Sequence, residues 1–309
     1  MKYFAFCLLF ISLGRSTICH AQPHLDSFRI YNDVKITMDV PSYRYKRTTL
    51  IVFALPNGNT TAQTMGKALA PGDDWHYDIQ HIKAQTSFIR EKLNRNIVVA
   101  YLENNYKSWP SWKQKHPDFK AEIRHIVDTL YNLIPSKRKT IQLSGHSGGG
   151  SFVFGYLAGV EKIPSAVQRI TFLDSDYGYD SSYYDKIRTW LKHIKTATLT
   201  VFAYNDSVAL LNGKPFVSAT GGTWFRSHLM LRHLRNDFSF SRPKDDSLIF
   251  YRSTNDQIAF FFKPNPDRKI FHTQQVELNG FIHSVLYRTD EENKGYEYFG
   301  PRAYSKFIE

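Results

Sequence analysis

The chain has 309 residues, of which 40 are Lys or Arg and 28 are Asp or Glu, so its formal net charge is +12. A chain of this length can bury a full hydrophobic core without cross-links. The positive balance favours anionic partners, but no long block of basic residues indicates nucleic-acid binding. The composition therefore predicts one globular domain without a nucleic-acid partner, and it leaves the oligomeric state open.

The N-terminal segment, 1–21, has the order of a secretory signal peptide. Lys2 precedes an apolar run over 3–13, and the segment ends at the small residue Ala21. This run of about eleven residues is shorter than the ~20 residues that a membrane-spanning helix needs. We therefore expect a secreted or periplasmic mature chain over 22–309, without stable insertion into a membrane. The only cysteines, Cys7 and Cys19, would be removed with the signal, which excludes disulfides and thiol chemistry.

Short apolar runs alternate with amphipathic segments along the mature chain. The runs that predict strands cover 28–31, 34–40, 49–55, 96–102, 140–143, 169–173, 198–203 and 275–278. Helical spacing of apolar residues marks 81–93, 119–133, 151–158 and 223–234. Strands that alternate with helices predict an α/β fold with a mostly parallel central sheet and helices on both faces.

The long connection over 207–272 predicts an insertion near the active site, with an extra hairpin at 248–262. The ligand of such a sheet lies beyond the carboxyl ends of its strands. Because most of the predicted strands stop at polar residues or glycines, these stops are expected to surround one crevice.

The sharpest motif is the sequence Gly145-His146-Ser147-Gly148-Gly149, which follows the strand at 140–143 and precedes the helix at 151–158. A serine on a tight strand-to-helix turn needs neighbours without side chains. The N–H groups at the start of the following helix can stabilise negative charge beside its hydroxyl. The motif therefore predicts a nucleophilic serine at Ser147.

In this motif and in the order of its elements, the sequence resembles the α/β-hydrolase superfamily. The resemblance implies that Ser147 is the nucleophile and that the backbone N–H of Gly148 is one oxyanion donor. The second donor would come from the loop after the strand at 49–55, where Gly58 and Asn59 are the candidates. The resemblance also implies the chain order serine, acid, histidine.

Histidines that follow the strand at 169–173 are candidates for the general base. They are His193, His228, His233, His272 and His283. His283 comes directly after the last predicted strand, 275–278, where the superfamily places its base. We therefore expect His283 to be the base.

The acid is predicted at Asp206, which follows the strand at 198–203, the second strand after the motif. Asp174 is the alternative acid, one strand earlier, and Asp176 is a third candidate beside it. A carboxylate at any of these strand ends could hold the imidazole of the base in one tautomer.

Together these residues predict a serine hydrolase that cleaves carboxylic esters, with carbohydrate or aryl alcohols as candidate leaving groups. A serine peptidase of the same fold and a non-catalytic binding protein on this fold are the alternatives. No cofactor is expected, and no zinc-binding motif or phosphate-binding loop occurs in the sequence. The expected partner is a small-molecule or glycan ester.

Overall fold

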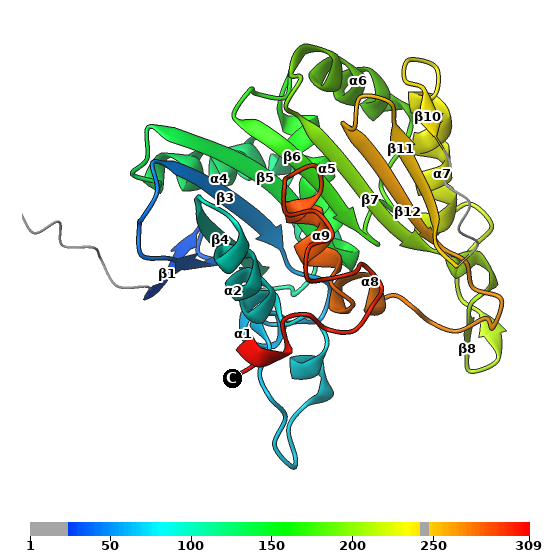
Figure 1. The fold of residues 1–309 in the computed structure, drawn as a ribbon, viewed down its shortest axis with the longest axis horizontal. Helices are drawn as coiled ribbons and strands as arrows, with labels where there is room; N and C mark the ends of the chain where they lie inside the picture. Colours follow the sequence, from blue (N-terminus) through cyan, green and yellow to red (C-terminus); the bar gives the residue numbers. More distant parts are fainter. Residues whose placement is uncertain (1–23, 242–246) are drawn as a thin grey trace, which may run out of the picture.

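The computed structural model describes residues 24–241 and 247–309, so the predicted signal peptide, 1–21, lies outside the described residues. Ten described strands form one sheet in the order β1-β2-β4-β3-β5-β6-β7-β12-β11-β10 (Figure 1). Its centre is parallel and consists of β4 (Asn96–Asn104), β3 (Arg47–Ala54), β5 (Arg138–His146), β6 (Val167–Leu173), β7 (Thr198–Tyr204) and β12 (Ile258–Lys263).

Antiparallel strands complete the sheet on both sides. They are β1 (His24–Ile30) and β2 (Val34–Val40) on one side, and β11 (Ile249–Ser253) and β10 (Phe240–Ser241) on the other. The strands predicted at 28–31 and 34–40 are thus present as the antiparallel pair β1 and β2. The predicted fold class is confirmed, because a mostly parallel sheet carries helices on both faces.

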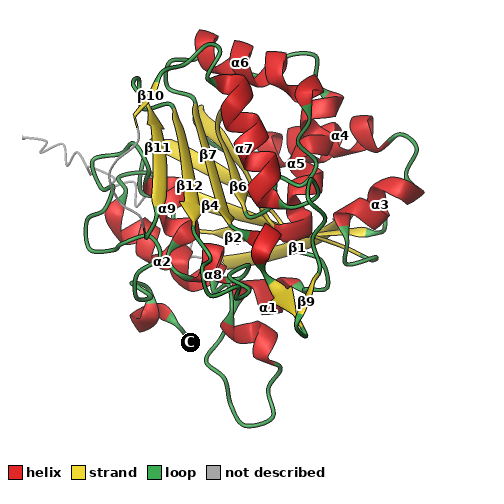
Figure 2. Cartoon of the chain, turned by 90° about the vertical axis from the view of Figure 1, so that its right-hand side faces the viewer, coloured by secondary structure: helices red, strands yellow, loops and turns green. Residues whose placement is uncertain are grey.

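Helices cover the two faces of the sheet with separate hydrophobic cores (Figures 1 and 2). One face holds α4 (Phe119–Leu133), α5 (Gly150–Gly159), α6 (Tyr184–His193) and α7 (Thr223–Leu234). The other face holds α2 (Ile82–Lys92) and α9 (Gly280–Leu286). The central strands are buried on both faces, which explains their continuous apolar runs. In the described residues, every helix is too short or too polar to cross a membrane.

Smaller elements occupy the connections between these layers. They are α1 (Thr61–Met65), α3 (Trp109–Lys115), α8 (Gln274–Glu277), and a two-stranded ribbon of β8 (Leu210–Leu211) and β9 (Lys214–Pro215). The ribbon lies in the connection from β7 to α7.

The predicted strand at 275–278 is wrong, because these residues belong to α8 and the turn after it. The last parallel strand is β12, which pairs with β7. The predicted insertion over 207–272 is therefore wrong for its second half, since β11 and β12 belong to the main sheet. A four-residue run is too short for its periodicity to separate a strand from a helix. β12 is longer, with six residues, and it is almost fully buried, as expected for a strand inside a parallel sheet.

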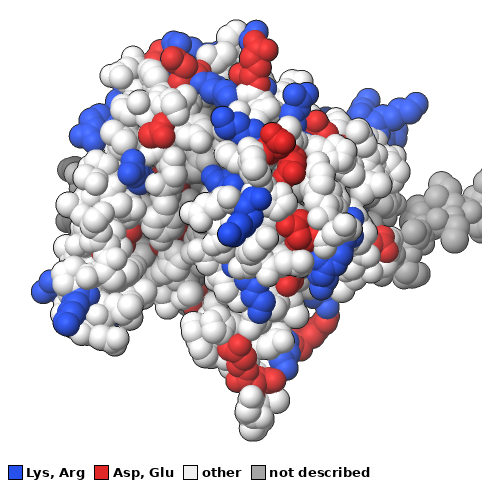
Figure 3. Space-filling view, turned by 180° about the vertical axis from the view of Figure 1, so that it is seen from behind, with Lys and Arg blue, Asp and Glu red and all other residues white. Residues whose placement is uncertain are grey.

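Acidic and basic side chains are interspersed on the face of the molecule seen from behind in Figure 3. Mixed signs of this kind lower the field that the net charge of +12 would otherwise produce.

Candidate active site

Ser147 lies on a sharp turn between β5 and α5. The strand ends at His146, and Ser147 itself has a φ of +53°, in the left-handed region. A residue other than glycine in this region costs on the order of 1–3 kcal/mol, and such strain concentrates at functional sites. A short 3₁₀ turn over Ser147–Gly149 then leads into α5. The strain and the helix start are the features that the sequence motif predicts.

Close packing explains the glycines after the serine. A Cβ on Gly150 would lie 1.7 Å from the carbonyl oxygen of Ser175, and one on Gly149 would lie 2.1 Å from that of Ala54. Real Cβ atoms do not approach a backbone oxygen so closely. The glycines therefore let the turn pack directly on the ends of β3 and β6, which carry the loops around the serine.

Asp174 and His272 form the carboxylate–imidazole pair of the site. Asp174 follows β6, is fully buried, and has a φ of +46°. Its Oδ2 accepts a short hydrogen bond from Nδ1 of His272. Because Nδ1 donates, Nε2 of His272 carries the lone pair in the neutral ring. His272 lies between β12 and α8, and about a quarter of its side chain is exposed.

His272 is held beside the serine turn through His146, the residue before Ser147. Nε2 of His146 donates to the carbonyl oxygen of His272 at 3.2 Å, and the two rings are 4.6 Å apart. Burial and then the charge of His272 hold the pKa of His146 well below its usual value, so this ring stays neutral. In the described part of the chain, the Ser147 hydroxyl has no hydrogen-bond partner. The bond between a nucleophile and its base is often long before substrate binds.

Asp206, the predicted acid, binds the start of α7 instead of a histidine. Its Oδ2 accepts the backbone N–H of Thr223 at 2.8 Å, and the helix has no side-chain cap of its own at Gly222. The Thr223 hydroxyl donates to Oδ1 of Asp174 and lies 3.3 Å from Oδ2 of Asp206. Burial and then the charge of Asp174 raise the pKa of Asp206 to about 6. Among the residues that the structure describes, no hydrogen bond joins Asp206 to His272. Asp206 holds Thr223, whose hydroxyl donates to Asp174.

Asp176, the third candidate acid, is buried on the same side. Its Oδ2 accepts from the Ser227 hydroxyl at 2.8 Å. Burial raises its pKa well above the usual value, and the charge of Asp174 adds to this despite the opposing hydrogen bond from Ser227. Asp176 is therefore bound by α7, and no hydrogen bond joins it to a histidine in the described residues.

The candidate oxyanion donors are only partly available. The N–H of Gly58 donates to the carbonyl oxygen of Lys107 at 2.8 Å and is therefore occupied. Asn59 is buried, and its side-chain Nδ2 has no partner among the described residues. The Asn57 side chain lies against Gly148, because a Cβ on Gly148 would be 1.9 Å from Asn57 Oδ1. The loop after β3 thus meets the turn at Asn57, which is not among the predicted donors.

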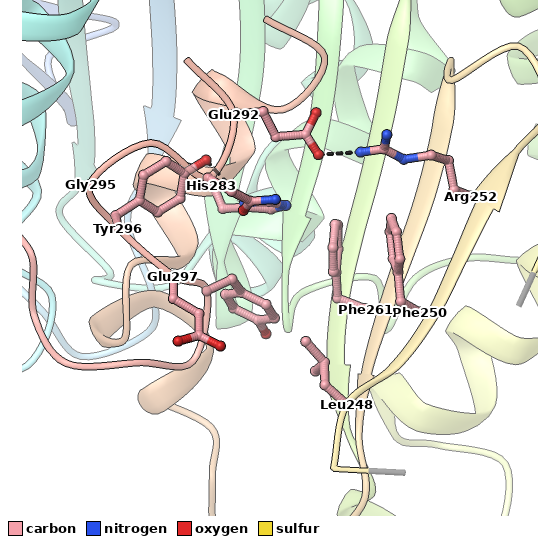
Figure 4. Close-up of a pocket in the computed structure, with 11 residues that line it drawn as sticks. Leu248, Phe250, Arg252, Phe261, His283, Glu292, Gly295, Tyr296 and Glu297 are labelled. Atoms are coloured by element: carbon pink, nitrogen blue, oxygen red, sulfur yellow. Dashed lines mark hydrogen bonds and ion pairs between the residues drawn. The ribbon is translucent and has the colours of Figure 1, made fainter. Parts of the chain in front are cut away.

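His283, the predicted base, lies elsewhere (Figure 4). It is buried on α9, its Nδ1 is 3.1 Å from the Tyr296 hydroxyl, and its ring packs edge to face on Phe261. It lines a cavity of about 970 Å³ that also contains the Arg252–Glu292 ion pair. Burial, followed by the charges of Arg252 and Arg169, lowers its pKa to about 3.

The structure does not bring His283 to any of the predicted acids, and the prediction that it is the base depended on the misplaced last strand. The superfamily rule places the base after the final strand, and the final parallel strand is β12 rather than 275–278. Applied to β12, the same rule leads to His272. The apolar run of β12 was the signal in the sequence that could have identified it. The structure thus brings His272 to Asp174 and to the serine turn, and it brings neither His283 nor Asp206 to that imidazole.

The element order, the strained serine turn and the pair after β6 and β12 together define the α/β-hydrolase fold. No protein-family model and no curated protein matches the sequence. Among solved structures, the chain is similar to poly(aspartic acid) hydrolase-1 from Sphingomonas sp. KT-1, with 13% identity over 85% of this chain and 99% of that chain and a TM-score of 0.44. It is also similar to an acetyl xylan esterase from Aspergillus awamori, with 10% identity over 78% of this chain and 92% of that chain and a TM-score of 0.43.

A third similar structure is alpha/beta hydrolase domain-containing protein 10 from mouse, with 9% identity over 85% of this chain and 99% of that chain and a TM-score of 0.38. The assignment of the fold rests on the strand order and the serine turn of this chain itself.

Proposed function

We propose that the protein is a serine hydrolase that cleaves carboxylic esters through an acyl-enzyme on Ser147, with His272 as base and Asp174 as acid. The observation that carries this proposal is the hydrogen bond from His272 Nδ1 to buried Asp174, beside a serine with a φ of +53°. A nucleophile whose base is itself oriented by a third group is the general signature of nucleophilic catalysis.

In the first half of the reaction, the Ser147 hydroxyl oxygen attacks the ester carbonyl carbon while His272 Nε2 takes the hydroxyl proton. Asp174 stays ionised, fixes the tautomer with its proton on Nδ1, and stabilises the imidazolium that forms. The tetrahedral oxyanion accepts hydrogen bonds from the N–H groups of Gly148 and Asn57. The alcohol then leaves with the proton from His272 Nε2, and the acyl group remains on Ser147.

In the second half, a water molecule gives a proton to His272 Nε2 and attacks the acyl carbon. The second tetrahedral intermediate collapses, Ser147 leaves as the hydroxyl with the proton returned by His272, and the carboxylic acid is released. Each preorganised donor at the oxyanion is worth about 3–4 kcal/mol of barrier in related chemistry. We propose the backbone N–H of Asn57 as the second donor because the Asn57 side chain lies against Gly148, whereas the N–H of Gly58 is bonded to Lys107. Asn59, in the same loop, stays a predicted donor.

The surroundings of Asp174 support its role as the ionised partner. Its Oδ1 accepts the Thr223 hydroxyl and its Oδ2 accepts His272, so both oxygens of this buried carboxylate are hydrogen-bonded. A buried charge is tolerated when it is paired and bonded in this way. Burial and then the charge of Asp174 raise the pKa of the neighbouring Asp206 to about 6, so this second carboxyl is less acidic than an exposed one.

We also propose that the protein acts outside the cytoplasm on a small-molecule or glycan ester. The signal-like segment over 1–21 supports export. The abundance of aromatic residues, with 19 Tyr and 5 Trp, is compatible with sugar or aryl leaving groups, because such rings stack on one face. The N-terminus of the exported protein, measured by intact mass, tests this part.

Labelling with a fluorophosphonate, followed by a panel of small acyl esters and amides, tests the activity. We expect one label per chain, on Ser147, and ester hydrolysis that Ser147→Ala abolishes. Faster turnover of amides than of esters would replace the esterase with the peptidase alternative. A wild-type protein that is neither labelled nor active on either panel would favour the non-catalytic binding protein.

A further inference from the structure

A cavity of about 590 Å³ lies at the opposite end of the sheet from Ser147. The amino ends of β3, β5, β6 and β7 form its walls, whereas Ser147 follows the carboxyl end of β5. A strand advances about 3.3 Å per residue, so the nine residues of β5 put roughly 26 Å between the two sites. The cavity is therefore separate from the proposed active site.

The lining of this cavity carries one sign of charge. Seven of its fourteen lining residues are Lys or Arg, six are Thr, one is Gln, and none is Asp or Glu. Arg47 and Arg138 face each other in register at the ends of neighbouring parallel strands. Threonine hydroxyls from the same strands lie below them, with Thr49 and Thr140 in contact at 3.3 Å. The lining differs from the face seen in Figure 3, where acidic and basic side chains are interspersed.

Three of the cations, Lys139, Arg169 and Arg288, are held by backbone carbonyl oxygens rather than by acids. Arg169 donates to the carbonyl oxygens of Ser284 and Tyr287 at 3.3 and 2.6 Å, and Lys139 donates to two carbonyl oxygens at 2.8 and 2.9 Å. Across residues 24–241 and 247–309, no side chain of the seven forms an ion pair within 4.0 Å. One carboxylate oxygen of Glu292 accepts the backbone N–H of Arg288, and the other pairs with Arg252, which does not line the cavity.

Like charges that lie close together in a recessed site repel one another, and burial and this repulsion together lower the pKa of two of the arginines. Burial and then the charge of Arg47 lower the pKa of Arg95, and burial and then Arg95 lower the pKa of Arg169 to about 10. An anion in the cavity would remove this repulsion and would be attracted by all seven cations together. The repulsion between these arginines therefore favours the binding of an anion in the cavity.

The side chains that line the cavity also indicate the chemical class of the anion. No aromatic side chain lines the cavity, so it offers no surface for stacking a base or a sugar ring. Guanidinium groups bind phosphate and sulfate through two parallel hydrogen bonds, and hydroxyls add further donors. We propose that this cavity binds a compact anion that carries two or more phosphate or sulfate groups, independently of ester hydrolysis at Ser147.

Calorimetric titration at low ionic strength with tripolyphosphate and with sucrose octasulfate tests the proposal and distinguishes the two sources of charge. We expect the wild-type protein to bind at least one of them, with an affinity that falls as salt is added. Arg47→Gln/Arg138→Gln should weaken binding by tenfold or more, because it removes two exposed cations that face each other. Binding of tripolyphosphate alone would assign the site to phosphate, and binding of the octasulfate alone to sulfate.

The matched control is Lys115→Gln/Lys162→Gln, which removes the same charge at two exposed positions outside both sites. It should change the dissociation constant by less than twofold, and hydrolysis of acyl esters should be unchanged in both double variants. Equal weakening by the two double variants would show attraction to the overall charge and would overturn the proposal. Failure of the wild-type protein to bind either anion would overturn it as well.

Discussion

Asp174 accepts a hydrogen bond from Nδ1 of His272 although the two residues are 98 positions apart in the sequence. The order of the strands explains the meeting, because β6 and β12 flank β7 in the sheet. Asp174 directly follows β6, and His272 is in the segment that follows β12. Asp206, just beyond the end of β7, is therefore close to both, and Thr223 bridges it to Asp174. Asp174 and Asp206 could thus each act as the acid. The hydrogen bonds favour Asp174, because it binds His272 whereas Asp206 binds the start of α7.

The first prediction concerns the two histidines. His272→Asn should lower turnover of acyl esters by about 10⁶, which is the typical cost of losing the base of such a triad. The asparagine amide can still donate to Asp174, as Nδ1 does, so the loss would report the missing Nε2. His283→Asn should leave turnover within a few-fold, because its ring contacts Tyr296 and Phe261 rather than the serine turn. Steady-state kinetics of both variants check this, and the assignment fails if His283→Asn is the inactive one.

The second prediction concerns the two carboxylates. Asp174→Asn should lower turnover by about 10⁴, because the amide favours the wrong tautomer of His272. Asp206→Asn should keep most of the turnover and lose about 1 kcal/mol of stability, the usual cost of a weakened helix cap. Its amide oxygen can still accept the N–H of Thr223. Measurements of kcat and of urea unfolding separate the two effects. A large loss of kcat in Asp206→Asn with little in Asp174→Asn would reverse the assignment.

Much of the fold followed from residue patterns, and the failures have physical causes. The bounds predicted for α4 and α7, 119–133 and 223–234, are those of the structure, since each helix has a clear apolar stripe. The strand predicted at 275–278 forms α8 instead, where buried Gln275 accepts the Tyr298 hydroxyl at 2.6 Å. Tyr298 is more than twenty positions away from Gln275, so the residues around Gln275 alone do not predict this contact.

The acid could not be chosen from sequence for a similar reason. Asp174 and Asp206 both follow a parallel strand, and the order of the chain permits either. The structure favours Asp174 because α7 begins at a glycine cap, Gly222, and Asp206 supplies the missing acceptor. That helix is seventeen positions after Asp206, and its approach depends on the packing of α7 on the sheet.

The third prediction concerns Thr223, which we assign as a positioning residue. Thr223→Val removes the hydroxyl that donates to Asp174 and keeps the shape of the side chain. Loss of a hydrogen bond to a charged group costs about 1.5–3 kcal/mol, so we expect lower stability and a fall in kcat of about tenfold or more. Thr223→Ser, which keeps the hydroxyl, should restore kcat. Equal kcat in the valine variant and the wild-type protein would show that the hydroxyl plays no part in catalysis.

The last prediction concerns the stability of the fold in acid. Burial and then the charge of Arg252 lower the pKa of His283 to about 3, whereas an unfolded histidine titrates near 6.5. Between these two values the unfolded chain binds more protons than the folded chain, so the free energy of unfolding falls as the pH is lowered. His283 alone should remove about 3 kcal/mol of stability between pH 7.5 and pH 4.5. His283→Asn cannot titrate but can keep the bond to Tyr296, and other titrating groups are common to both proteins. Urea unfolding at the two pH values should therefore show a smaller acid-induced loss in the variant, and parallel losses in the two proteins would contradict the lowered pKa.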